Sequence, residues 1–119
     1  MDFWRAEALL TGVERVRFGV TTALAFLGGG DMVMRTDDPA YGDAYLAALD
    51  TVGLRFFLAV GPRRAPFPWN YTQWDGDSSR TVSVSFERQL EVSEALIKKW
   101  NGAGDGRLHL AMAYPTHHP

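Results

Sequence analysis

The side chains best suited to chemistry lie in two parts of the sequence. His117 and His118 are adjacent, and imidazole serves as an acid, a base or a metal ligand near neutral pH. Neighbouring residues rarely point at one ion, and no third ligand is close in the sequence, so the pair is a poor metal site by itself. Trp69, Tyr71 and Trp74 offer aromatic faces on which a flat ring can stack. The alternative for these aromatic residues is to pack their own loop onto the protein surface.

Other chemical motifs are weak. The run Gly28-Gly29-Gly30-Asp31 lacks the spacing, the lysine and the following helix of a phosphate-binding loop. Asp37 and Asp38 suggest paired carboxylates, but Asp38 followed by Pro39 is better explained as a helix cap. His109 lies within a strand pattern, which favours a structural role. The chain has no cysteine, and this excludes disulfides, thiolate zinc sites and cysteine nucleophiles.

The composition is that of a globular protein. The chain has 119 residues, of which 46% are hydrophobic and 22% are charged. With 12 basic and 14 acidic residues the net charge is −2, and no basic patch is present, so we expect no nucleic-acid partner. The N-terminal residues do not form a signal-peptide pattern, and no apolar run approaches the ~20 residues of a membrane helix. We therefore expect no membrane contact and a cytoplasmic location.

Alternating helix and strand patterns would position the candidate residues. Apolar residues at helical spacing predict a helix over residues 3–18, and we expect its buried side to carry Ala6, Leu9, Leu10, Val13 and Val16. Further helices are expected from Asp38 to Gly53 and from Ser83 or Ser85 to Trp100. Apolar runs predict strands over 20–26, 54–60 and 107–113, and a long irregular loop is expected over 61–82.

The order α-β-α-β-α-β implies an α/β fold with about three parallel strands joined by right-handed crossovers. Because all three strands are apolar nearly throughout, we expect cover on both faces of the sheet. Three parallel strands leave both sheet edges open, which makes them a poor complete sheet. The pattern therefore predicts part of a larger structure.

Three segments, in this order, resemble the amidohydrolase superfamily. They are Phe18-Gly19-Val20-Thr21-Thr22, the strand Gly53–Gly61 that begins Gly-Leu-Arg, and residues 97–113, which hold Lys98-Lys99-Trp100-Asn101-Gly102 and Arg107-Leu108-His109. The match is best with the branch of triazine hydrolases and of guanine, cytosine and S-adenosylhomocysteine deaminases. The resemblance implies that residues 1–119 are a single partial segment of a (β/α)₈ barrel, roughly its second to fourth strands.

Enzymes of this branch use a divalent metal to activate water, which hydrolyses a C–N bond of a cyclic or heteroaromatic amidine or amide. Zinc or iron is thus implied for the complete barrel. The family's metal ligands are a His-x-His after the first barrel strand, later histidines and a late aspartate, and this sequence contains no His-x-His. We therefore expect this chain alone to bind no cofactor and to have no activity, so the enzyme assignment belongs only to the complete barrel.

The resemblance also assigns candidate substrate contacts. Barrel active sites lie at the carboxyl ends of the strands, so the tail after the third strand would face the pocket. Relatives often carry a Pro-His pair there, whereas in this sequence Pro115 is followed by Thr116, and His117 and His118 come next. These histidines, with Trp69 and Trp74 in the preceding loop, are the predicted substrate-binding residues. Solvent-exposed histidines without a function are the alternative.

Two classes of function remain open. The first is a portion of a metal-dependent hydrolase whose partners are a small-molecule substrate and complementing barrel segments. The second is a non-catalytic α/β module that self-associates as a homo-oligomer or docks on a partner, thereby covering its open strand edges. The two differ in whether metal and activity return when further barrel segments are present.

Overall fold

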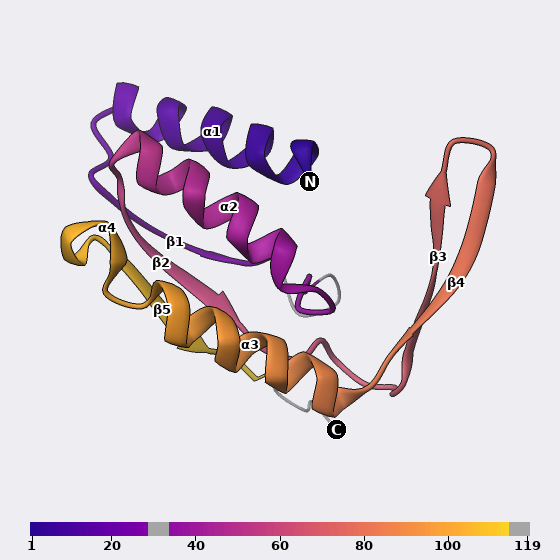
Figure 1. The fold of residues 1–119 in the computed structure, drawn as a ribbon. Coiled ribbons are helices and arrows are strands. Elements are labelled where there is room, and N and C mark those ends of the chain that lie inside the picture. Colours follow the sequence, from indigo (N-terminus) through magenta and orange to yellow (C-terminus); the bar gives the residue numbers. More distant parts are fainter. Residues whose placement is uncertain (29–33, 115–119) are drawn as a thin grey trace.

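Helices and strands alternate along the chain, and one β-hairpin is inserted before the last long helix (Figure 1). The computed structural model describes residues 1–28 and 34–114. The elements are α1 (Asp2–Arg17), β1 (Thr22–Phe26), α2 (Pro39–Val52), β2 (Arg55–Val60), β3 (Trp69–Asp75), β4 (Ser78–Val84), α3 (Phe86–Trp100), α4 (Ala103–Gly106) and β5 (Leu108–Met112). The predicted α/β class is thus confirmed.

The central sheet has three parallel strands in the order β1-β2-β5. Leu24 of β1 lies opposite Phe57 of β2, and Phe57 in turn lies opposite His109 of β5. Each strand is linked to the next through at least one helix, as parallel pairing requires. The predicted number and direction of these strands are confirmed, and the described strands do not close into a barrel.

Local signals set the ends of the two best-defined helices. Asp38 caps α2 by accepting a hydrogen bond at Oδ1 from the Ala40 amide at 2.8 Å, and Gly53 ends it with φ 82°. Ser85 rather than Ser83 caps α3, because its hydroxyl accepts from the Arg88 amide at 3.0 Å. These contacts confirm the predicted start and end of α2 and decide between the two candidate caps of α3.

The hydrophobic core lies between one face of the sheet and the long helices. Alternate strand residues are fully buried against α2 and α3, namely Phe56, Leu58, Val60 and Leu108. The two helices approach closely at Gly42, where an added Cβ would lie only 2.6 Å from the Leu96 side chain. Each large side chain buried here contributes about 1.5–3 kcal/mol to stability.

The other face of the sheet is uncovered in the described structure. Leu24 is 68% exposed, Phe26 43% and Phe57 40%. His109 stacks on Phe57 with ring centroids 4.7 Å apart, so it belongs to this face as well. The prediction that both faces would be covered is wrong for the described residues, because the long helices pack on the same face.

The hydrophobic side of α1 also differs from the prediction. The helix buries Ala8 and Gly12 on the side that faces α2, and a Cβ added at Gly12 would lie 3.2 Å from the Val52 side chain. Leu10 is instead 66% exposed. The sequence pattern located the helix correctly, but of the predicted apolar residues only Leu9 packs against the core. The helix instead turns its small residues towards α2, because they permit a closer contact.

The predicted irregular loop over residues 61–82 is confirmed only for residues 61–68, and the rest of the segment belongs to a β-hairpin. Strands β3 and β4 form an antiparallel hairpin in which Trp69 pairs with Val84 and Asp75 pairs with Ser78. Gly76 and Asp77 form its two-residue turn, with φ 60° at Gly76. Figure 1 shows the hairpin projecting away from the helices and the central sheet.

Candidate functional site

The carboxyl ends of the parallel strands meet at one edge of the sheet. There the Leu27 amide donates to the Ala59 carbonyl at 3.0 Å, and the Ala113 amide donates to the Val60 carbonyl at 2.7 Å. Parallel α/β proteins bind substrates at this edge because loops after successive strands converge there. The side chains that follow β1 and β2 are therefore the candidates for a functional site.

Gly61 holds the loops of this edge together. Any side chain on Gly61 would overlap the Ala113 carbonyl oxygen, so only glycine permits this approach of the β2 and β5 ends. The buried Thr36 hydroxyl donates to the Gly61 carbonyl at 2.6 Å. The segment leading into α2 is thereby fixed over the end of β2.

An arginine–aromatic cluster occupies this edge next to the hairpin. Its members are Arg35, Asp37, Tyr41, Arg63, Trp69 and Tyr71. Arg35 Nη2 lies 3.0 Å from Asp37 Oδ2, and the Tyr71 hydroxyl donates to the same oxygen at 2.7 Å. The Asp37 side chain is only 4% exposed, so this carboxylate connects the α2 loop to strand β3 in a largely dry environment.

The aromatic faces of the cluster are in contact with guanidinium groups. The Arg35 guanidinium lies 4.1 Å from the Tyr41 ring centroid and 5.1 Å from that of Tyr71. Arg63 lies 4.7 Å from the Trp69 centroid, and Trp69 and Tyr71 are themselves 4.6 Å apart. Each cation–π contact of this kind contributes about 0.5–2 kcal/mol. The cluster thus fastens the base of the hairpin to the body of the protein.

The electrostatics of the cluster favour hydrogen bonding over proton transfer. Burial, followed by the hydrogen bond to Asp37 and the charge of that carboxylate, raises the pKa of Tyr71 to about 12. The Tyr71 phenol therefore remains protonated near neutral pH and acts as a donor to Asp37. This geometry positions the loops at the edge of the sheet.

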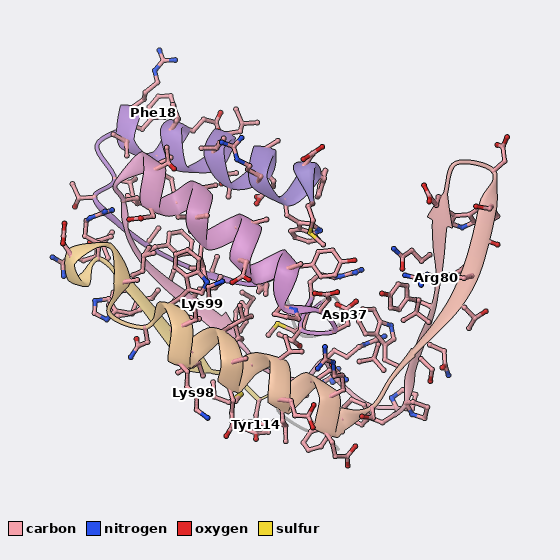
Figure 2. The ribbon with its side chains drawn as sticks, viewed as in Figure 1. Phe18, Asp37, Arg80, Lys98, Lys99 and Tyr114 are labelled. Carbon is pink, nitrogen blue, oxygen red and sulfur yellow. The ribbon has the colours of Figure 1, made fainter. Side chains whose placement is uncertain are left out.

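A cavity of about 270 Å³ separates the hairpin from the start of α2. Figure 2 places Asp37 on the body and Arg80 on the hairpin, on the two sides of this cavity. Arg80 donates to Gln73 Oε1 at 3.0 Å across the hairpin. Asp37 Oδ1, Arg35 Nε and Arg63 Nε are buried without a hydrogen-bond partner among the described residues.

The predicted substrate-binding residues do not form one group in the described structure. Trp69 lies in the cluster, whereas Trp74 is 67% exposed near the hairpin turn. The two residues are five positions apart in β3, and an odd separation along a strand places their side chains on opposite faces. His117 and His118 lie outside the described residues. Trp69 and Trp74 therefore cannot stack on the same ring.

Sequence reasoning missed Arg35 and passed over Asp37. Their contacts reach far along the chain, since the hydrogen bond from Tyr71 to Asp37 spans 34 positions. The available signal was the polar run Arg35-Thr36-Asp37 placed after an apolar strand and before the cap of α2. A polar run at that point of a βα connection lies at the carboxyl edge of the sheet.

The described part of the chain does not supply a metal site. Within residues 1–28 and 34–114, no group of three His, Asp or Glu side chains gathers closely enough to hold an ion. A structural or catalytic zinc site needs at least three protein ligands. The donor set here therefore does not fit the zinc or iron that the sequence resemblance implies for a complete barrel.

The comparisons with known proteins are negative. No family model, no curated protein and no solved structure matches this chain. None of the helices in the described ranges is long and apolar enough to cross a bilayer.

Proposed function

We propose that this chain is a three-strand portion of a metal-dependent amidohydrolase barrel. The complete barrel would be a cytoplasmic hydrolase that deaminates a cyclic or heteroaromatic amidine or amide with metal-activated water. One observation carries the proposal: the parallel sheet has helices on one face, and an uncovered apolar face that includes Leu24, Phe26 and Phe57 on the other.

A (β/α)₈ barrel accounts for this asymmetry. In such a barrel each strand has a helix on its outer face and contributes its alternate side chains to a packed interior. Leu24, Phe57 and His109 lie in one row across β1, β2 and β5 and all belong to the uncovered face. Further strands would cover this row and pair with the open edges of β1 and β5.

In this proposal the chain contributes part of the barrel wall and part of the rim. The arginine–aromatic cluster fixes the loops after β1 and β2, and His117 and His118 follow the carboxyl end of β5 as substrate contacts. Trp69 belongs to the rim through its contact with Arg63. The metal ligands would come from residues outside the described part of the chain.

The alternative function is a non-catalytic α/β module that self-associates or docks on a partner. The outer side of α1 favours it, since Phe3 is 69% exposed and Leu10 66%. The same surface would also be present on a barrel portion. The exposed surface therefore does not distinguish the two functions, whereas metal content and catalytic activity do.

The test is an assay of the protein encoded by the full reading frame that contains this sequence. We expect that protein to purify with close to one zinc or iron per chain and to release ammonia from aminated heteroaromatic rings. The 119-residue chain assayed alongside it should show neither property. A full-length protein without metal that releases no ammonia from such rings would contradict the proposal.

A further inference from the structure

Apolar side chains form a continuous stripe on the outer side of α1. Phe3 is 69% exposed, Leu10 66%, Val13 47% and Val16 49%. With Ala6 these residues define the α1 stripe. Positions 3, 6, 10 and 13 follow the alternating three- and four-residue steps of a helix that packs along another helix.

Nothing in the described structure covers the α1 stripe. The helix meets α2 through Ala8 and Gly12, which lie on its opposite side. Figure 2 shows Phe18, which is 85% exposed, pointing away from the body at the end of the helix. Together the stripe and Phe18 leave roughly 500 Å² of apolar surface in water, near the upper limit for an ordinary monomer.

The charges of α1 indicate the direction of the helix that fits this surface. Asp2 lies in the first turn, and Arg15 and Arg17 lie in the last. By helical spacing Asp2 and Arg17 fall at the two ends of the stripe. An antiparallel copy of α1 places each Asp2 beside the partner's Arg17 and also opposes the two helix dipoles, whereas a parallel copy places like charges side by side.

This direction distinguishes a second copy from a neighbouring barrel helix. Helices of a (β/α) barrel run parallel to one another, as α1 and α2 do in Figure 1. A neighbouring barrel helix packed on the α1 stripe would therefore place its N-terminus next to Asp2. The charge order of α1 instead suits an antiparallel occupant, and this chain carries a sequence with the matching order.

We propose that the α1 stripe is a self-association surface on which α1 of a second copy packs antiparallel, centred near Leu9 and Leu10. In this arrangement Ala6 lies opposite the second copy's Val13, and Phe18 meets its Met1, which is 54% exposed. Full burial of this surface on both copies would remove about 1,000 Å² of apolar surface from water, which is the lower limit for a specific interface. The proposal does not depend on the barrel.

Sedimentation equilibrium of the whole chain tests the surface. The wild-type chain is expected to form a dimer, and Leu10→Glu should raise the dimer dissociation constant by about 100-fold or more, because it buries a charge at the centre of the interface. Leu24→Glu is the matched control, since Leu24 is 68% exposed on the uncovered sheet face and Leu10 is 66% exposed. It should leave the dimer unchanged, and circular dichroism should show both variants folded.

A charge exchange tests the direction. Asp2→Arg alone and Arg17→Asp alone should each weaken the dimer by about 10-fold at low salt, because each places like charges together twice in the dimer. The double variant Asp2→Arg/Arg17→Asp should regain the wild-type dissociation constant. A loss of helix stability alone would not be reversed in this way.

Three outcomes would overturn the proposal. They are a wild-type chain that sediments as a monomer, a Leu24→Glu variant that dissociates as much as Leu10→Glu, and a double charge variant that is no better than the single ones. None of these outcomes decides the barrel proposal, whose failure is measured by metal content and ammonia release.

Discussion

The central sheet and the β-hairpin are held in place by different forces. The sheet packs one face against α2 and α3 through fully buried side chains such as Phe56 and Leu96. The hairpin projects from the body and is anchored at its base by polar and cation–π contacts centred on Asp37. An isolated two-stranded hairpin is marginal in water. The position of the hairpin should therefore depend on a few polar and cation–π contacts, whereas the stability of the sheet should depend on the packing of its buried side chains.

The largest expected effect comes from the buried face of β2. Phe56→Ala should lower the free energy of unfolding by about 3–5 kcal/mol because it leaves a cavity in the core. Phe57→Ala, one residue along the same strand, should cost less than about 1 kcal/mol because Phe57 lies on the uncovered face. Urea unfolding followed by circular dichroism measures both variants. Equal costs would mean that the second face is covered in solution.

Removal of the carboxylate that anchors the hairpin should have the next largest effect on stability. Asp37→Ala is expected to destabilise the protein by about 3 kcal/mol, since it leaves the mostly buried Arg35 without its carboxylate partner. Asp50→Ala removes the more exposed pair with Arg107 and should cost less than about 1 kcal/mol. Hydrogen exchange should also quicken in residues 69–84 of the Asp37 variant alone. Unchanged exchange there would show that other contacts hold the hairpin.

The raised pKa of Tyr71 predicts that the stability of the protein falls as the pH rises in the alkaline range. Its folded pKa of about 12 lies above the ordinary tyrosine value of 10.0, so the protonated phenol is favoured in the folded state. The stability that this contributes is complete below pH 10 and is lost as the pH rises towards 12. Melting temperatures across this range should fall less steeply for Tyr71→Phe than for the wild type. Parallel slopes would contradict the proposed bond to Asp37.

The smallest effect is expected near the hairpin turn. Trp74 is 67% exposed, so Trp74→Ala should change the free energy of unfolding by no more than about 0.5 kcal/mol. Trp69→Ala should cost more, because the indole contacts Arg63 and Tyr71. Chemical unfolding of the two variants under the same conditions compares them. A larger loss for Trp74 would mean that the exposed side of the hairpin is covered in solution.

Local signals in the sequence were enough to predict the three long helices and the three parallel strands. Asp38, Pro39 and Gly53 bound α2 as expected, and the apolar runs became β1, β2 and β5. The sequence could not tell which face of the sheet would be covered, because Leu24 on one face and Ala23 on the other are both apolar. That choice depends on where the helices pack, which is a property of the whole fold.

The hairpin and the cluster were harder to predict for a different reason. Pro62, Pro66 and Pro68 made the segment resemble a loop, and they outweighed the Gly76-Asp77 turn signal. The bond between Tyr71 and Asp37 joins residues far apart in sequence, and no local pattern encodes it. Distant polar contacts of this kind decide where the hairpin lies.

The coding sequence on both sides of this segment tests most directly whether the uncovered sheet face is the inside of a hydrolase barrel. We expect an open reading frame that continues in both directions, with a His-x-His encoded upstream and further histidines and an aspartate encoded downstream. Stop codons in frame on both sides would contradict it, because no further strands would then exist in this chain to cover Leu24 and Phe57.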